Sequence, residues 1–273
     1  MRDRLWLRLR RSKLIRRCYE FRPLSYFIRT MSSLAVPPAR KVRVRVLAGP
    51  GKGLLVRINP RWEHALWEGS YEPITQQLVQ QFCRPGTVFF DVGANFGYYS
   101  MLAARNGAKV IAFEPDFALA EELQLHVKLN GLEGRIELHR LAVFSRTGEV
   151  FLDPAGENTA HGSAHVCSSE IPETRSVRVR CTTLDDFVAE HLAPGLMKID
   201  VEGAESDVLK GAEQAFGSTR PLILCEVHDP ANQEFVTCWL EKRKYKTRWL
   251  VSPRGFPRQL FGWPDERMGV FPI

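Results

Sequence analysis

A short loop between an apolar segment and a helix-like segment is the part of this chain that most clearly suggests chemistry. The apolar segment, 87–91, is predicted to be a buried strand and ends on a carboxylate, Asp91. The loop that follows contains residues that favour tight turns, namely Gly93, Ala94, Asn95 and Gly97. Glycine lets a backbone pass close to a ligand, and asparagine tolerates left-handed dihedrals better than other non-glycine residues. The loop is therefore a candidate ligand-binding turn.

A second acid, Glu114, ends the next apolar segment, 109–114. A carboxylate at the end of the second strand of an α/β unit accepts hydrogen bonds from both hydroxyls of a ribose. A dinucleotide site would need glycine N–H groups facing a pyrophosphate, whereas here Asn95 holds the middle position and Asp91 would repel a phosphate. A cationic nucleoside with an amino-acid tail fits better, and S-adenosylmethionine has a sulfonium and an ammonium group.

Two further carboxylates, Asp200 and Glu202, occur at the end of the segment 196–201, which is predicted to be a strand. Alternation places Lys198, Asp200 and Glu202 on one side of the chain if the strand continues that far. Either acid could bind an acceptor hydroxyl and take its proton. Both could instead bind a metal, but two carboxylates without a third ligand are weak grounds, and we expect no metal. Alternatively, Glu202 caps the following helix and Lys198 neutralises Asp200.

A third pair of ionisable residues, Glu226 and His228, lies at the end of the segment 221–227. The two side chains share a face of this predicted strand. An unperturbed histidine has a pKa close to neutral pH, so His228 is a candidate general base, although a purely structural histidine is the alternative. The candidate catalytic residues are therefore Asp200, Glu202, Glu226 and His228.

The elements that must position these residues follow from the periodicity of the sequence. Helices are predicted at 72–83, 96–105, 117–130 (closed by Gly131), 184–190 and 207–216. Strands are predicted at 87–91, 109–114, 135–139, 149–152, 177–181, 196–201, 221–227, 246–252 and 267–271. The segments 149–152 and 177–181 are expected to pair around a polar loop, 153–175. Thr183 is expected to cap the helix 184–190 in a capping box with Asp186.

Strand–helix alternation predicts an α/β fold with a doubly wound, mostly parallel sheet. In such sheets, ligands bind at the carboxyl ends of the strands, near the point where the strand order reverses. The acids described above all lie at these ends. Before this region, residues 41–58 alternate in apolar character around a glycine-rich turn, which predicts an N-terminal β-hairpin.

Six motifs occur in a characteristic order and spacing. They are Asp91-Val-Gly-Ala-Asn-Phe-Gly, Phe113-Glu-Pro, Thr183-Leu-Asp-Asp, Lys198-Ile-Asp-Val-Glu-Gly-Ala-Glu, Leu209-Lys-Gly-Ala and Glu226-Val-His. Over roughly residues 70–230 this pattern resembles the FkbM-like family of class I S-adenosylmethionine-dependent methyltransferases. The resemblance implies a Rossmann-like fold with a seven-stranded sheet, and O-methylation of a hydroxyl on a sugar, glycolipid or natural-product acceptor.

The resemblance also implies roles for individual residues. The loop from Asp91 to Gly97 and the carboxylate of Glu114 would hold the cofactor, and the two later strand ends would face the acceptor. Many class I enzymes have an acid after the third strand to bind the adenine amino group, but this chain has His139-Arg140-Leu141-Ala142-Val143 there. Adenine would then be held by main chain and apolar contact around Ala142.

The expected domain organisation is a basic N-terminal arm followed by one methyltransferase domain. The arm is 1–40 and the domain is 41–273, made of a hairpin lead-in (41–70), a cofactor-binding core (71–230) and C-terminal strands (231–273). No apolar run approaches the 18 residues that a membrane-spanning helix needs.

Basic charge is concentrated in the arm. Residues 1–33 contain ten Arg and Lys and two acids, so with a total net charge of +7 the rest of the chain is at −1. This distribution argues against a nucleic-acid-binding domain, whose basic residues would lie on the folded surface. The arm could contact an anionic membrane, form a solvated, partly helical extension that docks on the domain, or act as a mitochondrial presequence. It lacks the apolar region of a secretory signal.

The six cysteines are scattered and contain no C-x-x-C motif, which excludes a recognisable zinc or disulfide framework. Cys83 and Cys225 lie in apolar contexts and are predicted to be buried thiols, so a cytoplasmic location fits best. Two alternative functions are a nicotinamide-dependent oxidoreductase on a similar fold and a non-catalytic, membrane-peripheral binding protein.

Overall fold

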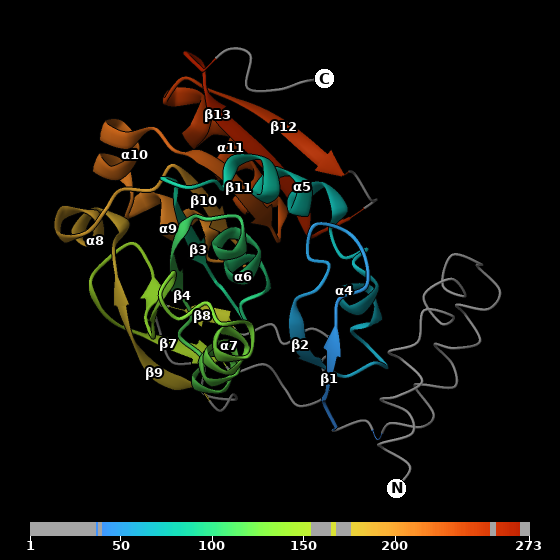
Figure 1. Ribbon diagram of the computed structural model, residues 1–273. Helices are drawn as coiled ribbons and strands as arrows, with labels where there is room; N and C mark the ends of the chain where they lie inside the picture. The colour runs from blue at the N-terminus through green and yellow to red at the C-terminus, as the bar shows by residue number, and fades with distance from the viewer. Residues whose placement is uncertain (1–36, 38–39, 154–164, 168–175, 252–254, 268–273) are drawn as a thin grey trace, which may run out of the picture. The chain divides into compact units, whose positions relative to one another are not determined.

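The computed structural model describes residues 37, 40–153, 165–167, 176–251 and 255–267 (Figure 1). The basic segment 1–33 lies outside these residues. The chain divides into two compact units, 1–73 and 74–273. None of the helices that the structure describes has the length and apolarity needed to cross a bilayer.

The first unit contains the predicted β-hairpin. Strands β1 (Val42–Arg45) and β2 (Leu55–Ile58) pair in antiparallel fashion, with Val44 opposite Val56. Both valines are buried, whereas the arginines that alternate with them are more exposed, as a strand with one covered face requires. A short helix that the periodicity did not predict, α4 (His64–Glu68), follows the hairpin.

The second unit is built on the predicted seven-stranded sheet. In spatial order its strands are β12 (Tyr245–Val251), β13 (Arg258–Pro264), β11 (Leu222–Val227), β10 (Leu196–Ile199), β3 (Val88–Val92), β4 (Lys109–Phe113) and β5 (Ile136–His139). The five strands from β11 to β5 are parallel, and β13 is antiparallel to both β11 and β12. The mostly parallel, doubly wound sheet is thereby confirmed.

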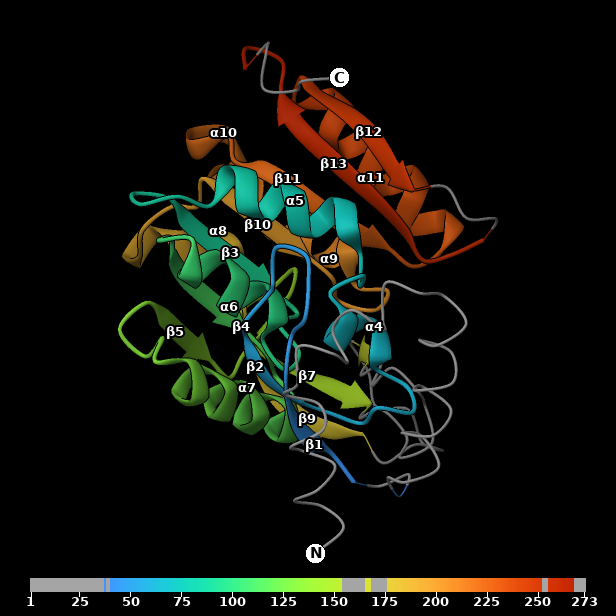
Figure 2. The same cartoon turned by 45° about the vertical axis from the view of Figure 1, so that its right-hand side comes forward.

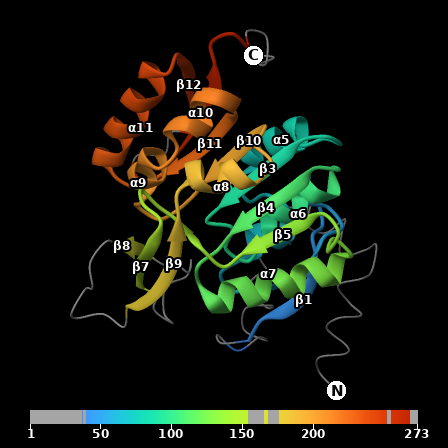
Figure 3. The same cartoon turned by 90° about the vertical axis from the view of Figure 1, so that its left-hand side faces the viewer.

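Seven helices in the described part of the chain flank this sheet. They are α5 (Pro73–Phe82), α6 (Tyr98–Arg105), α7 (Phe117–Asn130), α8 (Leu184–Glu190), α9 (Glu205–Lys210), α10 (Glu213–Thr219) and α11 (Pro230–Lys242). In Figure 2, α5 lies in front of the sheet and α11 behind it; Figure 3 shows α8, α9, α10 and α11 together on one face. The core between α8 and the strands includes edge-to-face contacts among Phe90, Phe113 and Phe187.

A smaller four-stranded sheet lies beside α9 in Figure 3. Its order is β6 (Ala142–Val143), β9 (Val177–Thr182), β7 (Gly148–Asp153) and β8 (His165–Cys167). The expected pairing of 149–152 with 177–181 is confirmed by the antiparallel register of β7 and β9. Strands β6 and β8 were not predicted, because two or three residues carry too little periodicity. Most of the polar loop 153–175 lies outside the described residues.

Two elements near the candidate site are shorter than predicted. The strand predicted at 196–201 ends at Ile199, although the N–H of Asp200 still donates to the carbonyl of Val92 (3.0 Å). The helix predicted at 207–216 is in fact two helices, α9 and α10, which meet at Gly211. A Cβ on Gly211 would lie 2.3 Å from the carbonyl oxygen of Phe144, so close backbone packing fixes this break.

The prediction that the C-terminal region, 231–273, contains only strands is wrong. Helix α11 precedes them, and β12 pairs with β13, a strand that was not predicted; residues 268–271 of the strand predicted at 267–271 lie outside the described residues. Asp229 caps α11 by accepting from the N–H of Asn232 (2.8 Å), and Pro230 occupies the first turn. An Asp-Pro pair is a typical helix start, so the sequence did contain the signal.

The expected caps and thiols are largely confirmed. Gly131 closes α7 with a φ of 66°, and Cys83 and Cys225 are both buried. Thr183 caps α8 by accepting from the N–H of Asp186 (2.9 Å). The other bond of a capping box, from the N–H of Thr183 to the carboxylate of Asp186, is not formed. This carboxylate accepts from the hydroxyl of Thr147 instead.

Candidate functional site

A cleft opens where the strand order of the large sheet reverses, at the carboxyl ends of β3, β4 and β10. Its empty volume is about 540 Å³, open solvent at the mouth included. It is lined by Gly93, Asn95, Phe113, Glu114, Pro115, Leu119, Leu141, Ala142, Val143, Leu152, Val166, Asp200, Val201 and Glu202. Three separate strand ends thus meet at the place where open α/β sheets bind ligands.

The loop after β3 adopts the left-handed conformations that its residue types suggested. Gly93, Asn95 and Gly97 have φ values of 77°, 52° and 86°. The two glycines are required by the protein itself. A Cβ on Gly93 would lie 1.8 Å from the carbonyl oxygen of Asp200, and one on Gly97 would lie 2.6 Å from Cγ of Leu123. Gly93 lines the cleft and Gly97 does not.

The N–H groups of this loop are already bonded within the protein. Those of Gly93 and Ala94 donate to the carbonyl of Phe113 (3.0 and 2.9 Å), and that of Asn95 donates to Glu114. The next two N–H groups donate to the Asn95 side chain and to the carbonyl of Ala94. A pyrophosphate needs such donors free, so the loop is unsuited to a dinucleotide.

Glu114 lies on the cleft wall with its carboxylate held from both sides. Oε2 accepts from the N–H of Asn95 (2.7 Å) and Oε1 from the N–H of Asp116 (2.9 Å), while the residue is only 5% exposed. Burial raises its pKa to about 7, although both hydrogen bonds oppose the rise. Each carboxylate oxygen has a second acceptor position, so the geometry leaves room for hydrogen bonds from two ribose hydroxyls.

Asp91 lies beneath the loop and does not line the cleft. Its Oδ2 accepts from the hydroxyl of Ser100 (2.6 Å), and its Oδ1 has no partner among the described residues. Burial at 1% exposure raises the pKa of Asp91, and the positive charge of Lys198 opposes that rise. A buried acceptor without a donor suits an ammonium group or an ordered water.

Part of the cleft wall is apolar. Leu141, Ala142 and Val143 line it from the segment around β6, and Leu119 lines it from α7. These residues could enclose an adenine by contact, as expected from the missing acid after the third strand. Ala94 is buried and does not line the cleft.

The two acids after β10 line the cleft and contact a histidine. Lys198 Nζ lies 2.7 Å from Oδ2 of Asp200, so the predicted neutralisation of Asp200 by Lys198 is confirmed. His228 Nε2 lies 3.1 Å from Oε2 of Glu202 and 3.7 Å from Oδ1 of Asp200. Glu202 does not cap α9, whose N-cap is Ala204 without a side-chain bond. The fold thus brings Asp200, Glu202 and His228 together.

His228 has a further partner, Glu205, which the sequence analysis did not single out although it is the last residue of the motif that begins at Lys198. Its Nδ1 lies 2.8 Å from Oε1 of Glu205, which is fully buried and also accepts from the N–H of Gly203 (2.9 Å). No local signal marks this glutamate as buried, because its burial depends on β11 and α11 packing over it. His228 does not line the cleft.

The protonation of His228 differs from the sequence-based expectation. Burial lowers its pKa, but hydrogen bonds with Glu202 and Glu205 and the charge of Asp200 outweigh burial and raise the pKa to about 10. The ring is therefore a cation at neutral pH. The hypothesis of a general base with a near-neutral pKa is not supported in this state, and His228 instead neutralises the acids around it.

Glu226 lies beside this cluster rather than in the cleft. Its Oε2 accepts from Nε2 of Gln259 (3.2 Å), whose Oε1 in turn accepts from the hydroxyl of Thr75 (2.8 Å). Asp200, Glu226 and His228 offer ligand atoms within 4.8 Å of one another. The absence of a catalytic metal stays a prediction.

Comparison with known proteins gives a family-model match and several curated relatives. The model of the methyltransferase FkbM domain matches residues 91–247. The hexuronic acid methyltransferase AglP of Haloferax volcanii is 28% identical over 63% of this chain and 68% of its own length. The 31-O-demethyl-FK506 methyltransferase FkbM of Streptomyces tacrolimicus is 30% identical over 54% and 67%.

Among solved structures, an FkbM methyltransferase from Methylobacillus flagellatus superposes with a TM-score of 0.50 at 20% identity. The match covers 65% of this chain but spans only 43% of that longer one, so it shows the shared fold alone. The family model, in contrast, matches more than half of this chain and begins at Asp91. The chain therefore belongs to the FkbM methyltransferase family and is a methyltransferase, and its relatives include the 31-O-demethyl-FK506 methyltransferase described above.

Proposed function

We propose that this enzyme transfers the methyl group of S-adenosylmethionine to a hydroxyl oxygen of a sugar, glycolipid or natural product. The observation that carries the proposal is the buried carboxylate of Glu114, which faces a cleft beside a loop whose N–H groups are all bonded. This combination favours a ribose and disfavours a pyrophosphate. The hexuronic acid and FK506 named for two relatives indicate hydroxyl-bearing acceptors.

Each part of the cleft would bind one part of the cofactor. Glu114 would accept from the ribose hydroxyls, and Leu119, Ala142 and Val143 would enclose the adenine. Asp91 lies beneath the loop rather than on the cleft wall, so its carboxylate would act on the ammonium group of the methionyl tail through its charge rather than by direct contact. When bound, the cofactor supplies an electrophilic sulfonium methyl.

Asp200 is the residue that we propose takes the proton of the acceptor hydroxyl. It lines the cleft, and Lys198 holds its Oδ2 so that Oδ1 is the oxygen left on the side of His228. Glu202 also lines the cleft, and we propose that it orients the acceptor while His228 fixes its position. A positioned base and close approach of the reacting atoms would together supply most of the acceleration.

Isothermal titration of the purified protein with S-adenosylhomocysteine and with NADH tests the cofactor. We expect the protein to bind S-adenosylhomocysteine and not NADH. Tighter binding of NADH would refute the proposal. A transfer assay with labelled S-adenosylmethionine and glycan, lipid and small-molecule extracts then tests the acceptor. Label should enter a base-stable ether, whereas label in a carboxyl ester would contradict transfer to a hydroxyl.

We also propose that the enzyme is cytoplasmic and that residues 1–33 contact an anionic membrane surface. Ten basic residues interleaved with Leu, Ile, Trp, Tyr and Phe support this contact, since basic amphipathic segments bind anionic lipids. Sedimentation with anionic vesicles should deplete the full chain and spare a variant that lacks 1–33. Equal sedimentation of both would end the membrane hypothesis and leave the methyltransferase proposal untouched.

A further inference from the structure

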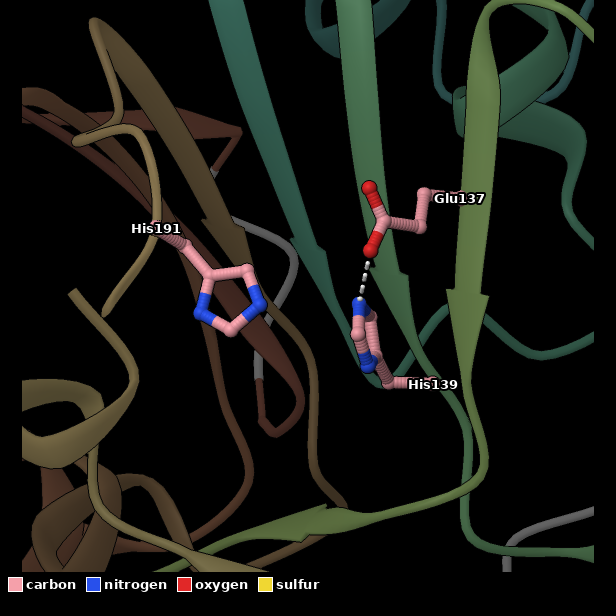
Figure 4. A group of neighbouring side chains, drawn as sticks. All are labelled: Glu137, His139 and His191. Atoms are coloured by element: carbon pink, nitrogen blue, oxygen red, sulfur yellow. Dashed lines mark hydrogen bonds and ion pairs between the residues drawn. The ribbon is translucent and has the colours of Figure 1, made fainter.

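A second group of metal-binding side chains lies outside the cleft, between the edge strand β5 and the end of α8. Glu137, His139 and His191 have ligand atoms within 4.8 Å of one another (Figure 4). None of the three lines the cleft. Glu137 and His139 are two apart on β5, so their side chains leave the strand on the same face. His191 follows the last residue of α8 and approaches them from a different element.

His191 is held in one orientation with one nitrogen committed. Its Nδ1 lies 2.9 Å from the carbonyl oxygen of Phe187, and its ring stacks on the Phe187 ring at 3.9 Å and 9°. Because a carbonyl only accepts, Nδ1 donates, and Nε2 of the neutral ring keeps its lone pair. Figure 4 shows a nitrogen of this ring facing His139. Metal-bound histidines are oriented by such a bond from their other nitrogen.

His139 is also fixed by its neighbours. Its ring stacks on Phe113 at 5.7 Å and packs edge-on against Phe187 at 4.9 Å. Its Nε2 lies 2.9 Å from Oε1 of Glu137, which is the spacing of adjacent ligands around one ion. A tetrahedral ion would hold its ligands about 3.3 Å apart, so a small side-chain movement completes the site.

We propose that Glu137, His139 and His191 bind a divalent transition-metal ion, Zn²⁺ foremost, with water completing the coordination. Two imidazoles and one carboxylate match zinc and its neighbours rather than Mg²⁺ or Ca²⁺, which prefer oxygen alone. Lys109, whose Nζ lies 4.0 Å from Oε2 of Glu137, is exposed and can move aside for the ion. The ion would tie the end of β5 to the end of α8.

Equilibrium dialysis of Zn²⁺ against the full chain, stripped of metal and without cofactor or acceptor, tests the site. The variants H191Q and E137Q each remove one ligand, and we expect either to weaken binding at this site at least about 100-fold. H64Q removes a histidine from the other unit and is the matched control, with wild-type binding expected. Zinc should also raise the Tm of the wild type and not that of H191Q, because an ion that binds only the folded chain stabilises it.

A further variant, H228Q, separates this site from the acidic group in the cleft region. If zinc affinity falls with H228Q and stays at the wild-type value in both H191Q and E137Q, the ion binds near Asp200 and the proposal is wrong. Thermal unfolding of each variant without metal shows that the comparison is between folded proteins. Co²⁺ in place of Zn²⁺ gives a second readout, since the visible absorption of the protein-bound ion should appear in the wild type and be lost in H191Q.

Discussion

The affinity of this enzyme for S-adenosylhomocysteine should depend on pH through Glu114. Its carboxylate already accepts from the N–H groups of Asn95 and Asp116, and burial still raises its pKa to about 7. Ribose hydroxyls donate to the charged form, so binding favours the carboxylate and lowers its pKa. A raised pKa in the free protein therefore means that the nucleoside must displace a proton below neutral pH, and affinity rises as pH increases through 7.

The size of the effect follows from that pKa. With a pKa of about 7, roughly a tenth of the free protein has a charged Glu114 at pH 6 and roughly nine tenths at pH 8. The apparent Kd should then be about tenfold higher at pH 6 than at pH 8, or about 1.4 kcal/mol. At pH 7 about half a proton should be released for each nucleoside bound, which titration calorimetry in buffers of different ionisation enthalpy measures directly.

Glu114→Gln is the control, because a glutamine does not titrate. Its affinity should be lower overall, since its NH₂ group must face one of the two backbone N–H donors, and its Kd should change little between pH 6 and 8. A wild-type Kd that is flat over this range would refute the ribose assignment. An equal slope in both proteins would place the titrating group elsewhere, for example at Asp91, whose pKa burial also raises.

Other perturbations should separate the roles of the remaining residues. Asp200→Asn should lower kcat about 10²–10⁴-fold and leave the Kd for S-adenosylhomocysteine within about threefold, by stopped-flow and calorimetry. Glu205→Gln should lower the pKa of His228 in an NMR titration, because it removes one of the carboxylates that raise it; an unchanged pKa would show that Glu205 has no such influence. Gly93→Ala should destabilise the fold by more than about 2 kcal/mol in urea, with Gly203→Ala as control, because both glycines have positive φ but only Gly93 has a neighbour within 4 Å. EDTA should leave kcat unchanged if proton transfer at Asp200 proceeds without a metal, and loss of turnover restored by Mg²⁺ or Zn²⁺ would contradict this.

Local sequence patterns were sufficient for the sheet and for one side of the cleft. The strand that ends on Asp91, the turn with Asn95 and the strand before Glu114 each combine an apolar run with a polar stop, and such patterns report burial directly. Helix α11 was missed although Asp229 and Pro230 mark its start, because the apolar positions within it follow the helical period weakly. The break at Gly211 depends on a contact with Phe144, sixty-seven residues earlier in the sequence, and no local rule contains it.

The charge of His228 could not be predicted from a local pattern either, because it depends on residues from other elements. A histidine that ends a strand has no charge state of its own, and three acids around His228 determine it. Two of them are Glu202, in the turn after β10, and Glu205, at the start of α9, whereas His228 follows β11. The pairing of these two strands is what turns a candidate base into a cation.

The contact between Gly93 and Asp200 links the side of the cleft that we propose binds the cofactor to the side that we propose binds the acceptor. Gly93 packs so closely on the carbonyl of Asp200 that no Cβ fits. The N–H of Asp200 in turn donates to the carbonyl of Val92, the last residue of β3 (3.0 Å). The two strand ends are therefore fixed to each other by backbone, independently of any side chain. Methyl transfer requires donor and acceptor within a few tenths of an ångström of the reactive geometry. We infer that glycine at position 93 serves this alignment, which explains why an alanine there should reduce turnover even where the variant still folds.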